Sequence, residues 1–230
     1  AFAAAFAGCT AESTAPETRL GGSPSNTLRA HDGNPLAEAL RKVDPAYSFE
    51  VVDERRADGL TIHTLRMTSQ DWMGGMGAVP SRWRHGVSIL VPDSLAHDTG
   101  FLWITGGTSD QTEPPEPPAI LLEMARRTGS VVTILRNVPS QPIRFADPAS
   151  GERASGTQAS GAQASGAPAD GTGRLEDDLI AYGWRRFLQN GARDEDVDWL
   201  MRLPMTKAAM RAMDTVEAFT RERLDGRAVR

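Results

Sequence analysis

Apolar and polar residues alternate along two neighbouring stretches of the chain, 47–52 and 60–67. Alternation with a period of two places one set of side chains on a single face of a β-strand. The segment between the two stretches includes Ala57-Asp58-Gly59, which has the composition of a tight turn. The pattern therefore predicts a β-hairpin with one buried face.

Two further strands are predicted at 85–93 and 100–105. The first ends in a Pro-Asp pair, which favours a turn. The second is almost continuously apolar, a pattern that is typical of a strand buried on both faces. We therefore expect the strand at 100–105 to be covered on both faces of the sheet.

A helix is expected at 119–128, because the two prolines before it suit its first turn and Gly129 suits the position after its end. A strand at 130–135 follows. Strand, helix and strand at this spacing predict a βαβ unit with two parallel strands. The sheet thus begins antiparallel and becomes parallel, and we expect the strand at 130–135 to have an unpaired flank.

Helical periodicity returns in the last third of the chain. A helix is predicted at 176–188, with one face made by Ile180, Trp184, Phe187 and Leu188. A last helix is predicted to begin at a Thr206 cap and to continue to Arg223. Its inward positions are expected to be Met210, Met213, Val216 and Phe219.

Two segments have compositions that cannot bury enough apolar surface to fold alone. Residues 10–43 are rich in Ser, Thr, Pro, Gly and Asn and predict a flexible tether. Residues 147–173 carry an Ala/Ser/Gly/Gln pentad repeat without an apolar face, which predicts a disordered insert. The expected organisation is a leader at 1–9, the tether, and one α/β domain at 44–230 that contains the insert.

Composition excludes several classes of protein. The chain of 230 residues carries 25 Lys and Arg against 30 Asp and Glu, a net charge of −5, so no broad basic field would attract nucleic acid. No run of about 18 apolar residues predicts a membrane-spanning helix. A single cysteine, Cys9, cannot form an internal disulfide.

The first nine residues, Ala1 to Cys9, form a short apolar run with small residues directly before the cysteine. This run resembles the end of a bacterial lipoprotein signal peptide, which implies lipid attachment at Cys9 and a place in the bacterial cell envelope, at the outer membrane facing the periplasm. Phe6 departs from that pattern, where an aliphatic residue is usual. The alternative is an alanine-rich leader in which the Cys9 thiol has no function.

Five short segments suggest a specific family. They are Thr68-Ser69-Gln70-Asp71-Trp72, Trp83-Arg84-His85, Asp178-Leu179-Ile180-Ala181-Tyr182, Arg202-Leu203-Pro204-Met205-Thr206-Lys207 and Arg211-Ala212-Met213-Asp214-Thr215-Val216. With these segments the chain resembles the PhoPQ-activated pathogenicity-related proteins from about residue 44 onward, apart from the pentad insert. The resemblance implies the N-terminal part of an α/β-hydrolase-like sheet.

The same resemblance implies that a strand ending in a Gly-x-Ser-x-x-Gly turn follows the last helix, so the nucleophile would lie beyond Arg230 in a truncated fold. Hydrolases of this fold order their triad as Ser, then Asp or Glu, then His. No catalytic triad residue is then expected within this chain. The 230-residue piece should be inactive alone.

The segment Thr105-Gly106-Gly107-Thr108 follows a predicted strand and precedes a helix. Hydrolases of this fold place one oxyanion-hole amide in such a loop, which makes Gly106, Gly107 and Thr108 the candidates here. A Gly-Gly pair after a strand is also common in ordinary turns. Both interpretations stay open.

The remaining chemically interesting residues have simpler explanations. The four histidines, His31, His63, His85 and His97, are expected to be structural or solvated, since no Cys or carboxylate has metal-ligand spacing to them. No serine lies in a Gly-x-Ser-x-Gly turn. The segment from Trp72 to Trp83, with Met73 and Met76, is read as core and loop anchoring in preference to a pocket lining.

These observations favour an envelope-anchored serine hydrolase that acts on an ester or amide of unknown identity, with no cofactor, no metal and no nucleic-acid partner. A first alternative is a non-catalytic envelope lipoprotein that keeps the hydrolase scaffold and serves in virulence or stress resistance. A second is a stress factor that only binds host or membrane-active peptides, an idea that rests on the family's name alone.

Overall fold

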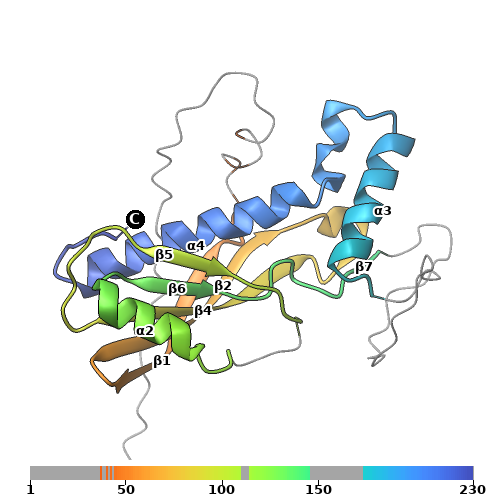
Figure 1. Ribbon diagram of the computed structural model, residues 1–230. Coiled ribbons are helices and arrows are strands. Elements are labelled where there is room, and N and C mark those ends of the chain that lie inside the picture. Colours follow the sequence, from red (N-terminus) through yellow and green to blue (C-terminus); the bar gives the residue numbers. More distant parts are fainter. Residues whose placement is uncertain are drawn as a thin grey trace, which may run out of the picture.

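The computed structural model describes residues 37, 40, 42, 44–109, 114–145 and 173–229, and the expected leader at 1–9 and the insert, up to residue 172, lie outside this part of the chain. A mixed sheet is covered by helices on both faces (Figure 1). The elements are β1 Ser48–Ala57, β2 Leu60–Asp71, η1 Gly74–Met76, β3 Ala78–Val79, β4 Arg82–Pro92, β5 Phe101–Ile104, α2 Ala119–Thr128, β6 Val132–Leu135, β7 Arg144–Phe145, α3 Glu176–Gln189, η2 Asp194–Trp199 and α4 Arg202–Arg223.

The predicted hairpin is confirmed as β1 and β2, which pair antiparallel. Asp58 and Gly59 connect the strands with φ angles of 48° and 77°. Positive φ at both central residues defines the type I′ turn, which matches the right-handed twist of paired strands. The Asp-Gly pair is thus the local reason for the hairpin.

The main sheet has five strands in the order β1-β2-β4-β6-β5. Every neighbouring pair is antiparallel except β5 and β6, which are parallel and connected through α2. This confirms the βαβ unit and the change from antiparallel to parallel pairing. The helix α2 has the predicted bounds, and Gly129 ends it with a left-handed φ of 65°.

Two expectations about the strands are wrong. β5 is an edge strand in the described sheet, with Phe101, Trp103 and Ile104 between 40% and 47% exposed, whereas burial on both faces was expected. β6 lies between β4 and β5, so its flanks are paired. A run of apolar residues shows that a strand can be buried. It does not determine the strand's position in the sheet, because that position depends on pairing with strands far away in the sequence.

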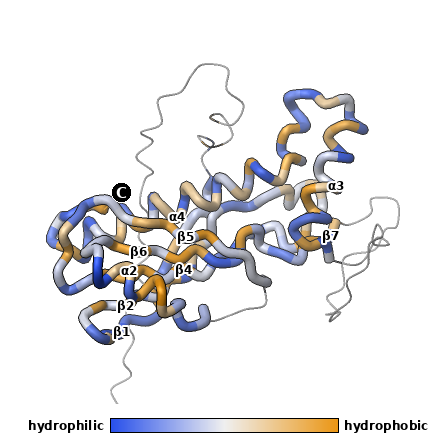
Figure 2. Tube along the Cα trace, in the orientation of Figure 1, coloured by the Kyte–Doolittle hydropathy of each residue, from blue (hydrophilic) through white to orange (hydrophobic). Residues whose placement is uncertain are grey.

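The two faces of the sheet pack against different helices. On one face, a core cluster that includes Leu65, Trp83 and Val87 packs against α4 through Ala208 and Phe219. On the other face, a smaller cluster packs against α2: Leu60, Ile62, Leu90, Leu121, Ala125, Val132 and Ile134. Apolar residues follow these strands in Figure 2.

The two long C-terminal helices exist as predicted but present different faces. In α3 the buried positions are Leu179 and Gly183, while Trp184 and Leu188 of the expected apolar face are 48% and 62% exposed. The helix therefore packs through Leu179 and through the backbone at Gly183, which has no side chain. No described helix is long and apolar enough to span a membrane.

α4 begins at Arg202, four residues before the predicted Thr206 cap. The Thr206 hydroxyl donates to the Arg202 carbonyl at 2.8 Å inside the helix, so it caps nothing. Val216 and Phe219 are buried as expected, but Met213 is 49% exposed. The buried side of α4 is shifted toward a row of polar residues that apolar periodicity does not detect.

Candidate functional site

The loop with the predicted oxyanion candidates, residues 105–109, leaves the carboxyl end of β5 and lies beside residues 136–141. The Gly106 carbonyl accepts a hydrogen bond from the Asn137 amide at 3.2 Å, and the Gly107 carbonyl accepts one from the Gln141 side chain at 3.0 Å. The Ser109 amide donates to the Gln141 carbonyl at 2.6 Å. These bonds fix the loop against the end of the parallel strand pair.

The amides of Gly106, Gly107 and Thr108 have no hydrogen-bond partner within the part of the chain that the structure describes. Gly107 has a φ of 154°, a backbone conformation that L side chains rarely adopt. Unpaired backbone amides on an ordered loop are the groups that stabilise a developing oxyanion. These three amides are therefore free to bind a ligand as far as the described residues go, and their role as oxyanion donors stays a prediction.

Thr108 and Ser109 also line a groove of about 920 Å³. The groove lies on the same face of the sheet as α2, over the part of that face that α2 does not cover. The segment that leads toward α2 forms another part of the lining. Its Pro114 approaches Gly86 so closely that a Cβ at Gly86 would lie 2.9 Å from the proline Cγ. Glycine at position 86 therefore permits the close packing of this segment on β4.

A buried Ser–His pair lies in the strands beneath the groove. The Ser69 hydroxyl and His85 Nε2 are 2.9 Å apart, and His85 Nδ1 is 3.1 Å from the Arg136 carbonyl oxygen. Because a carbonyl only accepts, Nδ1 carries the proton and Nε2 accepts from Ser69. Both residues are at most 3% exposed, so this pair serves the core and offers no nucleophile to a substrate.

Burial lowers the pKa of His85 from 6.5 to about 4, against smaller opposing effects of hydrogen bonds to the Arg136 and Asn137 backbone. The neutral imidazole is therefore favoured in the folded state. The unfolded chain binds a proton more readily below pH 6.5, so folding stability from this group is complete above that pH. It is lost as the pH falls toward 4.

We expect urea unfolding of the chain to show a loss of roughly 3 kcal/mol between pH 7 and pH 4 from His85 alone. The variant His85→Gln should flatten that part of the pH dependence, while the loop variant His97→Gln should retain it. Burial also lowers the pKa of His63, which contributes in the same direction in every variant. Equal pH slopes in His85→Gln and His97→Gln would contradict this assignment.

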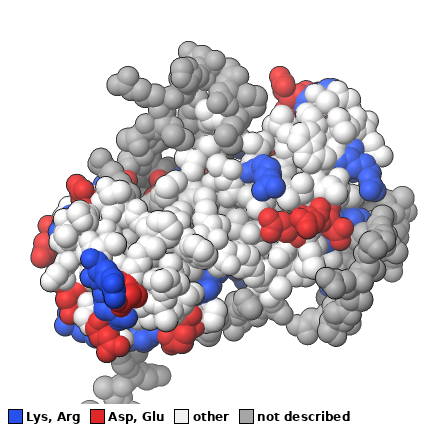
Figure 3. All heavy atoms as spheres, viewed as in Figure 1, with Lys and Arg blue, Asp and Glu red and all other residues white. Residues whose placement is uncertain are grey.

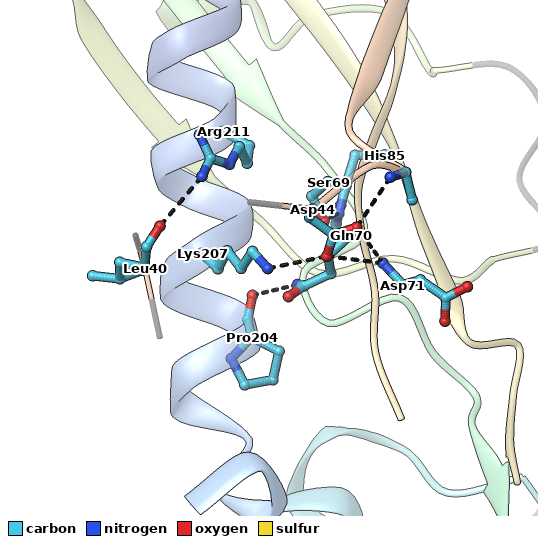
Figure 4. Close-up of polar contacts among 10 residues, drawn as sticks. Leu40, Asp44, Ser69, Gln70, Asp71, His85, Pro204, Lys207 and Arg211 are labelled. Atoms are coloured by element: carbon cyan, nitrogen blue, oxygen red, sulfur yellow. Dashed lines mark hydrogen bonds and ion pairs between the residues drawn. The ribbon is translucent and has the colours of Figure 1, made fainter. Parts of the chain in front are cut away.

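Figure 4 shows a second set of polar contacts, between α4 and the strands beneath it. Lys207 Nζ lies 3.0 Å from Asp44 Oδ2, and both side chains are about nine-tenths buried. Asp44 also accepts hydrogen bonds from the amides of Ala46 and Asp71 at 3.1 and 3.3 Å. Gln70 donates to the Pro204 carbonyl at 2.8 Å. This network joins the start of the domain to β2 and α4.

One turn further along α4, Arg211 pairs with Asp214 at 2.6 Å and donates to the Leu40 carbonyl. The Tyr47 hydroxyl lies 2.9 Å from the Thr215 hydroxyl, and burial raises the pKa of Tyr47 to about 12. Within the described residues, each buried side-chain polar atom of this group has a protein partner, except Arg211 Nε. The arrangement is that of a structural network and not of a reactive centre.

Sequence reasoning missed Asp44, Lys207 and Arg211. The signal that was available is their spacing, because Lys207, Arg211 and Thr215 recur every four residues beside the small residues Ala208 and Ala212. Four-residue spacing places side chains on one helix face. When charged residues recur on the same helix face as small residues, they indicate a face that is buried and makes polar contacts.

The other predicted residues fall as follows. His63 lies in β2 with its ring 4.7 Å from that of Phe219, and His97 lies in the connection between β4 and β5. Trp72 is buried and its indole nitrogen donates to the Asp198 carbonyl at 3.0 Å. Cys9 and His31 lie outside the described residues. Among the residues that are described, no cluster of His, Cys, Asp and Glu could hold a metal ion.

Comparison with known proteins tests the resemblance directly. The family model described as PhoPQ-activated pathogenicity-related protein matches residues 36–155 and 168–227. The chain is also 33% identical over 186 residues to autocrine proliferation repressor protein A of Dictyostelium discoideum, an alignment that covers 80% of this chain and 32% of that protein. The chain therefore spans about a third of this relative's length. It belongs to the family of PhoPQ-activated pathogenicity-related proteins.

Proposed function

We propose that this chain forms the first part of an α/β-hydrolase-type domain in a serine hydrolase of the cell envelope, which cleaves an ester or amide. The observation that carries the proposal is the loop after β5, whose amides have no partner among the described residues and which adjoins a groove through Thr108. In this proposal the loop supplies one oxyanion-hole amide. The nucleophile, the acid and the base come from sequence beyond Arg230.

The sheet supports this proposal through its order and directions. α/β-hydrolases take one oxyanion amide from the loop between a strand and the first helix of the domain. Here the corresponding connection runs from β5 to α2, inside the parallel pair. β5 is also an edge in the described sheet, where a further parallel strand carrying the nucleophile turn could be added.

Two variants of Thr108 separate its amide from its side chain. Thr108→Pro removes the N–H, whereas Thr108→Ala keeps it and removes only the hydroxyl and methyl groups. In the protein expressed from its complete reading frame, we expect Thr108→Pro to lower kcat for a p-nitrophenyl ester by roughly 100-fold or more, the effect of losing one oxyanion donor. Thr108→Ala should stay within a few fold of the wild type.

The thermal unfolding of both variants provides the control, because a proline that disturbs the fold would lower Tm together with kcat. A wild-type Tm with unchanged kcat in Thr108→Pro would remove Thr108 from the proposed machinery. Gly106 and Gly107 would then be the remaining amides of the loop.

The alternative is a non-catalytic envelope protein on the same scaffold. It is favoured by the name of the Dictyostelium relative, which describes repression of proliferation. A fluorophosphonate that labels active serine hydrolases separates the two functions. Covalent labelling of a single serine supports the enzyme, whereas a folded complete protein that is neither labelled nor active supports the alternative.

The envelope location is part of the same proposal and depends on a lipid at Cys9. Its support is the sequence pattern that ends at Cys9. Mass spectrometry of the mature N-terminal peptide tests it, since an unmodified cysteine there would exclude the anchor.

A further inference from the structure

Four arginines line the groove. Arg66 of β2 pairs with Glu50, and the other three are Arg82 and Arg84 from β4 and Arg136 directly after β6. Residues 82 and 84 share one face of β4 because side chains alternate along a strand. The residue between them, Trp83, is fully buried on the opposite face. The alternation Arg-Trp-Arg thus places both guanidinium groups on the groove side of the sheet.

Arg82, Arg84 and Arg136 have no carboxylate partner within the described chain. The ion pairs of that part of the structure include neither Arg82, Arg84 nor Arg136. Glu50 is the one acidic residue in the lining, and it lies 3.6 Å from Arg66. The groove therefore concentrates positive charge in a chain whose net charge is −5.

Arg136 is the most constrained of the three. One of its terminal nitrogens donates to the Pro115 carbonyl at 3.1 Å, while its Nε is buried and has no partner among the described residues. An unsatisfied buried donor costs free energy unless a ligand or water pairs with it. The Thr108 and Ser109 hydroxyls add further hydrogen-bonding groups to the lining.

The surface around α2 does not share this property. On the face drawn in Figure 3, positive and negative side chains alternate around α2, where Glu123 pairs with Arg126 and Arg127. Such exposed pairs are mutually neutralised. The groove differs because, among the described residues of its lining, the one carboxylate belongs to Glu50, which pairs with Arg66 and leaves the other three arginines without an acidic partner.

We propose that this groove binds a small organic molecule that carries a phosphoryl group. Guanidinium groups bind phosphate oxygens with paired, charge-assisted hydrogen bonds, and a doubly charged phosphoryl group can engage more than one arginine. The groove also has apolar lining from Pro114 and Pro115, and its volume is that of a site for a drug-sized molecule. The phosphoryl group contacts Arg84 and Arg136, and the apolar body lies along Pro114 and Pro115.

The test measures binding and needs no enzymatic activity. Its result is therefore independent of whether the proposed hydrolase activity exists. Phenyl phosphate, inorganic phosphate and benzoate are titrated calorimetrically into the chain. We expect phenyl phosphate to bind most tightly, and Arg84→Gln to weaken it by about tenfold or more, the loss of one charge-assisted hydrogen bond. The exposed α3 variant Arg185→Gln is the matched control and should bind like the wild type.

Each outcome has one meaning. Saturable binding that Arg84→Gln weakens and Arg185→Gln does not supports the site. Absence of saturable binding, or equal loss in the two variants, overturns it. If benzoate binds as tightly as phenyl phosphate, the site does not select a phosphoryl group. If inorganic phosphate binds as tightly as phenyl phosphate, the organic part of the ligand contributes nothing to binding. Circular dichroism of both variants verifies that the fold is retained.

Discussion

Replacing Gly183 by alanine is expected to destabilise the chain by roughly 3 kcal/mol, although alanine is the better helix former. Gly183 lies in the middle of α3 and is buried. A Cβ at this position would lie 2.1 Å from the Trp199 carbonyl oxygen, a distance that no side chain accepts. Because the neighbouring atom belongs to the backbone, relief requires α3 and the end of η2 to move apart.

Helix propensity alone predicts the opposite sign, a gain of about 1 kcal/mol on replacing glycine by alanine. Urea unfolding followed by tryptophan fluorescence distinguishes the two effects. Gly75→Ala is the matched control, since a Cβ there meets nothing within 4 Å, and it should change stability by less than about 0.5 kcal/mol. A more stable Gly183→Ala variant would show that the helices are not in this contact.

The contrast between α2 and α3 shows which parts of the fold local sequence determines. α2 has the predicted bounds because Pro118 and Gly129 mark its two ends with local backbone preferences. α3 was located correctly, but its apolar residues Trp184 and Leu188 point to solvent in the described structure. Its packing face is set by the contact between Gly183 and Trp199, which periodicity cannot anticipate.

The candidate site shows the same division. The loop at 105–109 was predicted from its place between a strand and a helix, and the structure ties it to residues 136–141 by hydrogen bonds across more than thirty positions of sequence. The arginine groove was not predicted, because it needs the strand order. β4 and β6 must be neighbours before Arg84 and Arg136 can share one surface.

Removing the buried cation at position 207 is expected to destabilise the chain by about 3 kcal/mol. Lys207→Met preserves the length and apolar stem of the side chain but leaves Asp44 buried with a negative charge. The amides of Ala46 and Asp71 still donate to that carboxylate, which holds the cost at the lower end of the range for broken buried ion pairs. The exposed neighbour Lys42 gives the matched control, because Lys42→Met should be nearly neutral.

The pair is tested by adding Asp44→Asn to Lys207→Met. Asparagine keeps an oxygen for the two amides and removes the charge, so the double variant should recover part of the stability that Lys207→Met loses. A double-mutant cycle measured by urea unfolding should then give a coupling energy above about 1 kcal/mol. Additive losses would mean that Lys207 stabilises α4 through its aliphatic stem, and the contact between the start of the domain and α4 would depend on Arg211 and Tyr47 instead.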